Sequence, residues 1–147
     1  MLFQRVNRTD PEKVFVIGKA TTTLVVDQVV SWDATSVTNN YVTVPAAGTL
    51  GLVAGVLTKA LATDEYGLVQ AYGYYPTALV TIKTSASTDA ALGTPLYAKA
   101  SQNAWEFAAA ADTLSTGVSA EFAIVLEAVT FVTDITNEQH KVFLRCL

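Results

Sequence analysis

The sequence has few of the residues that catalytic and metal sites are built from. Its 147 residues include one cysteine, Cys146, and one histidine, His140. A disulfide within the chain or a zinc site of cysteine and histidine needs more such residues, so a single chain can form neither. A serine or cysteine nucleophile would have to use His140 as its base, and no Gly-x-Ser-x-Gly elbow accompanies it. We expect no enzyme activity, no cofactor and no metal.

Charge is scarce as well. Charged residues make up 15% of the chain, with nine Lys and Arg against 13 Asp and Glu. The cations are spread singly, whereas a surface that follows phosphates needs them clustered, so nucleic acid is not an expected partner. The longest lightly charged stretch, residues 49–62, falls short of the ~20 apolar residues of a membrane span. The start lacks the pattern of a secretory signal, so we expect no membrane partner and synthesis in a cytosol.

What the sequence does contain is typical of a folded β protein. Hydrophobic residues make up 51% of the chain, and they recur with period two, the spacing of half-buried strands. The clearest case is residues 117–129, where the even-numbered side chains are expected to line the core. A second run, residues 22–32, has a bulge expected near Gln28. Shorter strands are expected at residues 13–17, 41–44, 52–58, 68–74, 78–83, 95–98, 105–107 and 141–145.

This spacing of short strands predicts one mainly β domain, residues 13–147, built as a small barrel, a β-tulip or a sandwich. Residues 86–92 and 107–114 are rich in alanine and are expected to form at most single helical turns. Residues 1–12 differ in composition, because Arg5, Arg8, Asp10 and Glu12 crowd into them. We interpret residues 1–12 as an extended N-terminal arm.

Several motifs have a structural interpretation beside a functional one. The glycines of residues 48–55 resemble a phosphate-binding loop, yet the Gly-Lys-Ser/Thr ending is absent, and glycines at a strand entry explain them better. His140 has carboxylates nearby in sequence that would suit a metal, but a solvated polar loop is the simpler interpretation. The pairs Asp64 with Glu65 and Glu121 with Glu127 have the composition of glycosidase carboxylates that face a cleft. Glu121 and Glu127 lie on the polar face of an expected strand, where charges are normally solvated.

Residues 67–76 hold a cluster of aromatic side chains in one expected strand, Tyr72, Tyr74 and Tyr75. Exposed tyrosines are enriched at protein interfaces, and a glycine inside a strand, here Gly73, marks a bulge or a close backbone approach. The same tyrosines would also serve to cover one end of the core. The sequence leaves these two interpretations open, and we take Tyr72, Tyr74 and Tyr75 as a candidate oligomer interface.

A resemblance to a known family rests on four short segments: residues 26–33, 51–56, 64–74 and 93–97. Taken in this order, the chain resembles the capsid decoration, or cement, proteins of tailed bacteriophages. The likeness covers roughly residues 13–128, and its motifs are glycines and apolar residues that build the fold. Residues 1–12 and 131–147 have no counterpart in it.

The resemblance implies a virion protein on the outside of an icosahedral head, where homotrimers hold neighbouring major capsid subunits together. Arg5, Arg8, Asp10 and Glu12 then become candidate capsid contacts. Two alternatives stay open. One is another phage part, such as a head fibre base, a tail protein or a head-completion protein. The other is a carbohydrate-binding β module in which Trp32, Trp105 or the tyrosines stack on sugars.

Overall fold

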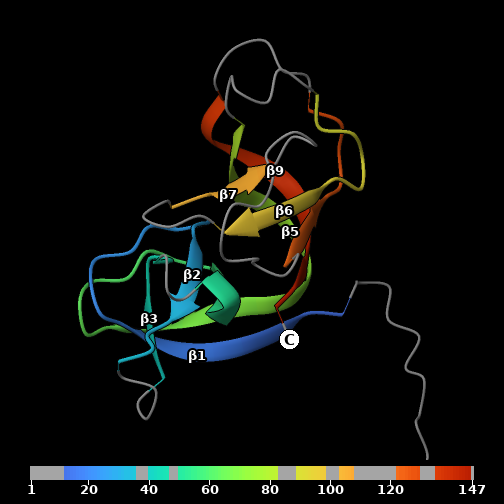
Figure 1. The fold of residues 1–147 in the computed structure, drawn as a ribbon. Helices are drawn as coiled ribbons and strands as arrows, with labels where there is room; N and C mark the ends of the chain where they lie inside the picture. Colours follow the sequence, from blue (N-terminus) through green and yellow to red (C-terminus); the bar gives the residue numbers. More distant parts are fainter. Residues whose placement is uncertain are drawn as a thin grey trace, which may run out of the picture.

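The computed structural model describes residues 12–35, 40–46, 50–82, 89–98, 103–107, 122–129 and 135–146. It confirms a mainly β fold: these residues form one mixed sheet of nine strands (Figure 1). The strands are β1 (Val14–Ala20), β2 (Val29–Trp32), β3 (Tyr41–Thr43), β4 (Val53–Leu57), β5 (Tyr66–Ile82), β6 (Pro95–Ala98), β7 (Trp105–Phe107), β8 (Ala123–Val125) and β9 (Ile135–Arg145). A short 3₁₀ turn, η2 (Leu50–Leu52), precedes β4.

The described residues form no α-helix. It follows that no helix in this part of the chain is long and apolar enough to cross a membrane. Ala90 lies in a bridge with Val129, so at this position the expected helical turn gives way to extended backbone. The arm of residues 1–12 lies outside the described residues except for Glu12, which is exposed.

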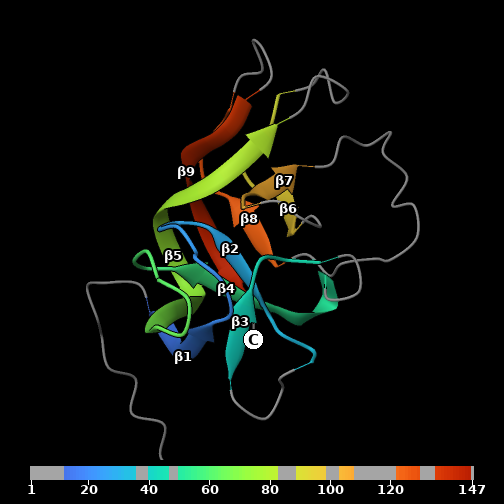
Figure 2. The ribbon, with the colours of Figure 1, turned by 90° about the vertical axis from the view of Figure 1, so that its left-hand side faces the viewer.

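The long strand β5 passes through both halves of the molecule, where the sequence predicts two strands (Figures 1 and 2). Pro76 lies within it, and proline lacks the N–H that a sheet ladder needs. The pairing of β5 with β9 shifts register between Tyr75 and Ala78, so a bulge accommodates the proline. β5 therefore continues where proline normally ends a central strand.

The pairings form two circuits that share β5. In the first half, β1 pairs with β3 in parallel, and antiparallel pairings then lead from β3 to β2, β4, β5 and back to β1. In the second half, β5 pairs with β7 in parallel, and antiparallel pairings lead to β6, β8, β9 and back to β5. The connectivity is the same in both, although neither circuit is a regular barrel.

The turns repeat along with the strands. A bridge joins Leu24 to Leu61 in the first half and Ala90 to Val129 in the second. Three residues after each first bridge partner, Asp27 and Gly93 have positive φ, 66° and 88°. The Asp27 N–H donates to the carbonyl of Leu57 at 3.0 Å, just as the Gly93 N–H donates to that of Val125 at 2.9 Å. The structure is thus an internal duplication in which one strand belongs to both copies.

Each half has its own core. The first half buries Ala20, Leu24, Val30, Val42, Ala54, Leu57, Leu61 and Val69. The second half buries a larger cluster that includes Trp105, Leu96, Val142 and Leu144, and this cluster also takes in Val29, Val53 and Val56 from the outer side of β2 and β4. The two halves therefore pack together, with β2 and β4 of the first half covering the core of the second half.

Two of the expected strands differ from the structure. In the region of residues 117–129, of which 122–129 are described, the buried side chains are Ala123, Val125 and Val129 rather than the even-numbered ones, because β8 pairs with β9 in the opposite phase. Residues 22–28 form a bridge and a turn, and the strand begins only at Val29. The expected irregularity lies between Val30 and Ser31, where the pairing of β2 with β4 shifts register.

Candidate interaction surface

The outer face of β1 and β5 exposes a group of large apolar side chains. Ile17 lies opposite Leu68 in the antiparallel ladder, with Tyr66 and Phe15 at either end. Their exposed fractions are 58% for Ile17, 47% for Leu68, 60% for Tyr66 and 44% for Phe15. We call these four residues the apolar strip. A contiguous exposed apolar patch marks a binding surface more often than scattered apolar residues do.

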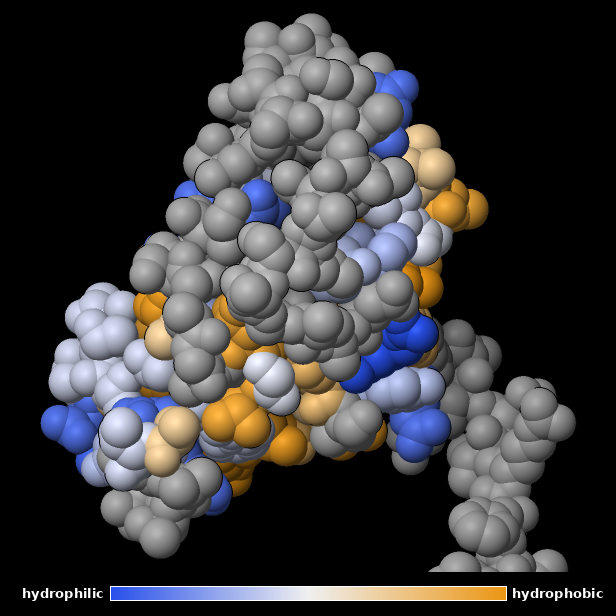
Figure 3. Space-filling model, in the orientation of Figure 1, coloured by the Kyte–Doolittle hydropathy of each residue, from blue (hydrophilic) through white to orange (hydrophobic). Residues whose placement is uncertain are grey.

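A shallow hollow of about 310 Å³ adjoins the apolar strip, lined by Ile17, Thr58, Lys59, Tyr66, Gly67 and Leu68. Figure 3 shows hydrophobic residues gathered on the lower part of the molecule, the part that holds β1 to β4. The strip contains every exposed large hydrophobic residue in the described part of β1 and β5.

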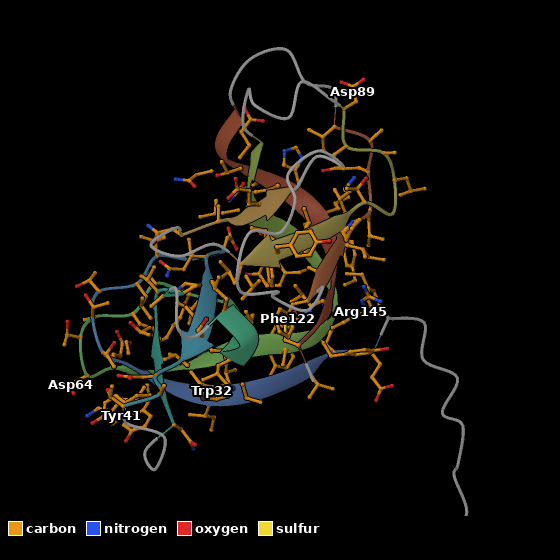
Figure 4. All side chains as sticks on the ribbon, in the orientation of Figure 1. Trp32, Tyr41, Asp64, Asp89, Phe122 and Arg145 are labelled. Atoms are coloured by element: carbon orange, nitrogen blue, oxygen red, sulfur yellow. The ribbon has the colours of Figure 1, made fainter. Side chains whose placement is uncertain are left out.

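Charged and aromatic groups border the strip. The Lys19 ammonium donates to Asp64 at 2.7 Å and to the Tyr41 hydroxyl at 3.0 Å. It also lies 5.9 Å from the centroid of the Tyr66 ring. The hydrogen bond to Asp64, followed by that to Tyr41, raises the Lys19 pKa well above its usual value. Figure 4 places Tyr41 and Asp64 close together at the end of the molecule opposite Asp89.

The carboxylates that the sequence singles out have cationic partners or lie outside the described residues. Asp64 pairs with Lys19, and Glu65 pairs with Lys59 at 2.7 Å. The Lys59 ammonium and the Ala62 N–H lower the pKa of Glu65. Glu121 is not among the described residues. Asp64 and Glu65 are thus engaged in separate surface ion pairs.

His140 lies within β9, so the expected polar loop is wrong at this position. Its Nδ1 is 3.1 Å from Glu127 Oε1, and Glu127 also accepts the Lys141 N–H at 3.1 Å. The Lys141 N–H and then the imidazole lower the pKa of Glu127 against the opposing effect of desolvation. Among the described residues, no group of three or more His, Cys, Asp or Glu is placed to hold a metal ion.

The three candidate interface tyrosines do not share one environment. Tyr75 is 6% exposed and belongs to the core of the second half, which leaves almost no side-chain area for another chain to bury. Tyr72 and Tyr74 are half-buried, and the rings of Tyr72 and Phe143 lie nearly perpendicular with their centroids 5.2 Å apart. The interface hypothesis therefore narrows to Tyr72 and Tyr74, where it stays a prediction.

Asp27, which sequence reasoning did not single out, is the centre of a buried polar network. The Asp27 residue is 6% exposed. It accepts the Tyr75 hydroxyl at 2.7 Å, the Thr77 hydroxyl at 3.0 Å and the Gln139 amide at 2.8 Å. Burial and then the bond to Asp27 raise the Tyr75 pKa well above its usual value, which keeps the hydroxyl a donor. The network joins residues 25–28 to β5 and β9.

The two tryptophans have little exposed ring surface on which a sugar could stack. Trp105 is completely buried in the second core, so it is closed to stacking. Trp32 is half-buried beside a hollow of about 80 Å³ that it lines with Asp33, Asn40 and Tyr41. Neither residue forms an open aromatic platform of the kind that carbohydrate-binding modules use.

Cys146 is half-buried against the second core, and its thiol donates to the carbonyl of Phe122 at 3.6 Å. Burial raises the pKa of the thiol to about 12. Such a thiol is unreactive at neutral pH.

Comparison of the sequence with protein-family models and with curated proteins found no match in either.

Proposed function

We propose that the chain is a capsid decoration protein of a tailed bacteriophage. It binds the outside of the icosahedral head, catalyses no reaction, and stabilises contacts between major capsid subunits. The observation that supports this most directly is the apolar strip, because 44–60% of each of its four side chains is exposed in the single chain. A protein that works by burying surface against other chains needs such a face.

The resemblance of residues 13–128 to cement proteins supplies the kind of partner. The chain then works in the virion, after synthesis in the host cytoplasm, as a homotrimer whose contacts to several subunits add through effective concentration. Arg5, Arg8, Asp10 and Glu12 are the proposed capsid contacts. Of these, Glu12 lies at the base of the arm, where its carbonyl passes close to Gly73 of β5.

The test is binding to expanded, undecorated heads of the phage that encodes the chain, measured by co-sedimentation. We expect the full chain to saturate the heads in hundreds of copies, which also separates a decoration protein from a connector present in about a dozen. Deletion of residues 1–12 should reduce this binding at least tenfold. The control is Asp33→Asn, far from the arm in sequence, whose carboxylate accepts an exposed hydrogen bond from the Thr35 N–H. Unchanged binding after the deletion would refute the role of the arm, and no binding of the full chain would refute the function.

A further inference from the structure

The internal duplication shows how the two halves contact each other. Residues 25–28, the turn before β2, lie against β5 and β9 of the second half. The Leu79 N–H donates to the Asp27 carbonyl at 3.0 Å. Thr77 and Gln139 donate to the Asp27 carboxylate. Within one chain, a turn of the first half thus docks on a strand pair of the second.

The strand pair that receives this turn has a counterpart in the first half. Leu79 lies opposite Gln139 in the pairing of β5 with β9. Lys19 lies opposite Tyr66 in the equivalent pairing of β1 with β5. Ile17 precedes Lys19 by two residues, as Thr77 precedes Leu79. The side chains of the apolar strip therefore occupy the position in the first half that receives the turn in the second, while the N–H of Lys19, the counterpart of that of Leu79, already donates to the Asn40 carbonyl at 2.9 Å.

The docking turn also has a counterpart. Residues 91–94 repeat the geometry of residues 25–28, with Gly93 in the place of Asp27. Pro95 lies two residues after Gly93, as Val29 lies two residues after Asp27. The counterpart of Leu92 in the docked turn is Val26, which is 43% exposed, whereas Leu92 is 68% exposed, more than any other large hydrophobic residue in the described part of the chain.

The chemistry of the two pairs of surfaces is matched. The turn that docks within the chain carries a carboxylate, and its receiving strands carry a hydroxyl and an amide. The turn of residues 91–94 carries Leu92 beside a glycine, and the apolar strip offers Ile17 and Tyr66 next to a hollow. Polar meets polar inside the chain, and apolar would meet apolar between chains.

We propose that a second copy of this chain occupies the apolar strip, and that residues 91–94 of one copy dock on Phe15, Ile17, Tyr66 and Leu68 of the next. The contact is head-to-tail, so it closes into a ring when the rotation between copies permits. This rests on the homotrimer of the proposed function and deepens it by naming the two surfaces that meet.

The test is the solution mass of the full chain by light scattering, together with two variants, Leu92→Asp and Ile17→Asp. Both positions are more than half exposed, so folding should survive, as circular dichroism will check. We expect the wild type to exceed the monomer mass of 15.6 kDa and each variant alone to be monomeric. An equimolar mixture of the two variants should form a dimer, because one supplies an intact strip and the other an intact turn.

Val26→Asp is the matched control. Val26 is the counterpart of Leu92, is 43% exposed, and lies in the turn that already docks within the chain, so its substitution should leave the mass unchanged. A monomeric wild type would overturn the inference, as would a mixture of variants that stays monomeric. If Ile17→Asp abolished head binding while the wild type were monomeric, the strip would belong to the capsid, and head binding would stand without the homotrimer. If the mass results held while heads bound no chain, the proposed function alone would fail.

Discussion

The Asp27 network gives the sharpest test of what holds the two halves together. Replacing Asp27 with glycine removes the carboxylate and leaves the backbone free to keep φ 66°, as Gly93 does in the equivalent turn. Replacing it with asparagine keeps the shape and one acceptor oxygen but removes the charge. The pair of variants therefore separates the contribution of the charged acceptor from that of the turn.

The magnitude follows from the three donors. The Tyr75 hydroxyl can fall back on the Leu57 carbonyl, which it already contacts at 2.9 Å, and Gln139 is exposed and can turn to water. A hydrogen bond to a charged group contributes about 1.5–3 kcal/mol, and one between neutral groups about 1 kcal/mol. Glycine regains roughly 1 kcal/mol by relieving the left-handed backbone. We expect a net loss of about 2 kcal/mol for Asp27→Gly and about 1 kcal/mol for Asp27→Asn.

The assay is urea unfolding followed by circular dichroism, with the slope of the transition held as a check on two-state behaviour. The control is Asp33→Asn, whose carboxylate makes its hydrogen bonds to Thr35 at the surface and should change the free energy of unfolding by less than about 0.5 kcal/mol. A role of the Asp27 carboxylate in stability is refuted if Asp27→Gly is as stable as the wild type, or if the Asp33 variant loses as much.

Three further predictions concern single residues. Glu127→Gln should lower the free energy of unfolding above pH 4.5, the ordinary pKa of this group, and the difference from the wild type should vanish as the pH falls through the lower native pKa. Urea titrations across pH 3–7 measure this difference, and an equal difference at all pH values would contradict the prediction. The Cys146 thiol should react with a disulfide reagent at pH 8 roughly a thousand times more slowly in the native than in the unfolded chain, and equal rates would refute its burial. Gly73→Ala should destabilise the fold, since the added Cβ would lie 2.1 Å from the Glu12 carbonyl oxygen on a backbone with φ 98°. Gly51→Ala should not, since a Cβ added there has no atom of the described residues, its chain neighbours aside, within 4 Å. Calorimetric melting temperatures compare the two variants.

The sequence predicts most strands because period two is a local signal. Residues 41–44, 52–58, 95–98 and 105–107 each contain a strand of the structure. The buried face near residue 124 was predicted in the wrong phase because both faces of that segment are apolar: Ala123 and Val125 on one, Ile124 and Leu126 on the other. Where alternation has no polar side, only pairing with a neighbouring strand decides which side chains face the core.

The Asp27 network lies beyond local signals. Its partners are 48, 50 and 112 residues away, so no spacing along the chain announces them. The one available sign was an aspartate set between Val26 and Val29, in a run otherwise suited to a strand. The duplication was hidden for a similar reason, because the turns that share a backbone geometry carry Asp27 in one half and Gly93 in the other.

The sharing of β5 has a consequence for how such a chain can grow. Each half needs five strands to complete its circuit, yet the chain makes both circuits with nine, since the closing strand of the first is the opening strand of the second. A gene that gained another unit would have to add only four strands beyond β9. For the same reason the protein cannot be divided into two complete halves, because a cut at either end of β5 leaves one fragment without the strand that closes its circuit. The halves are therefore expected to be inherited, folded and lost together.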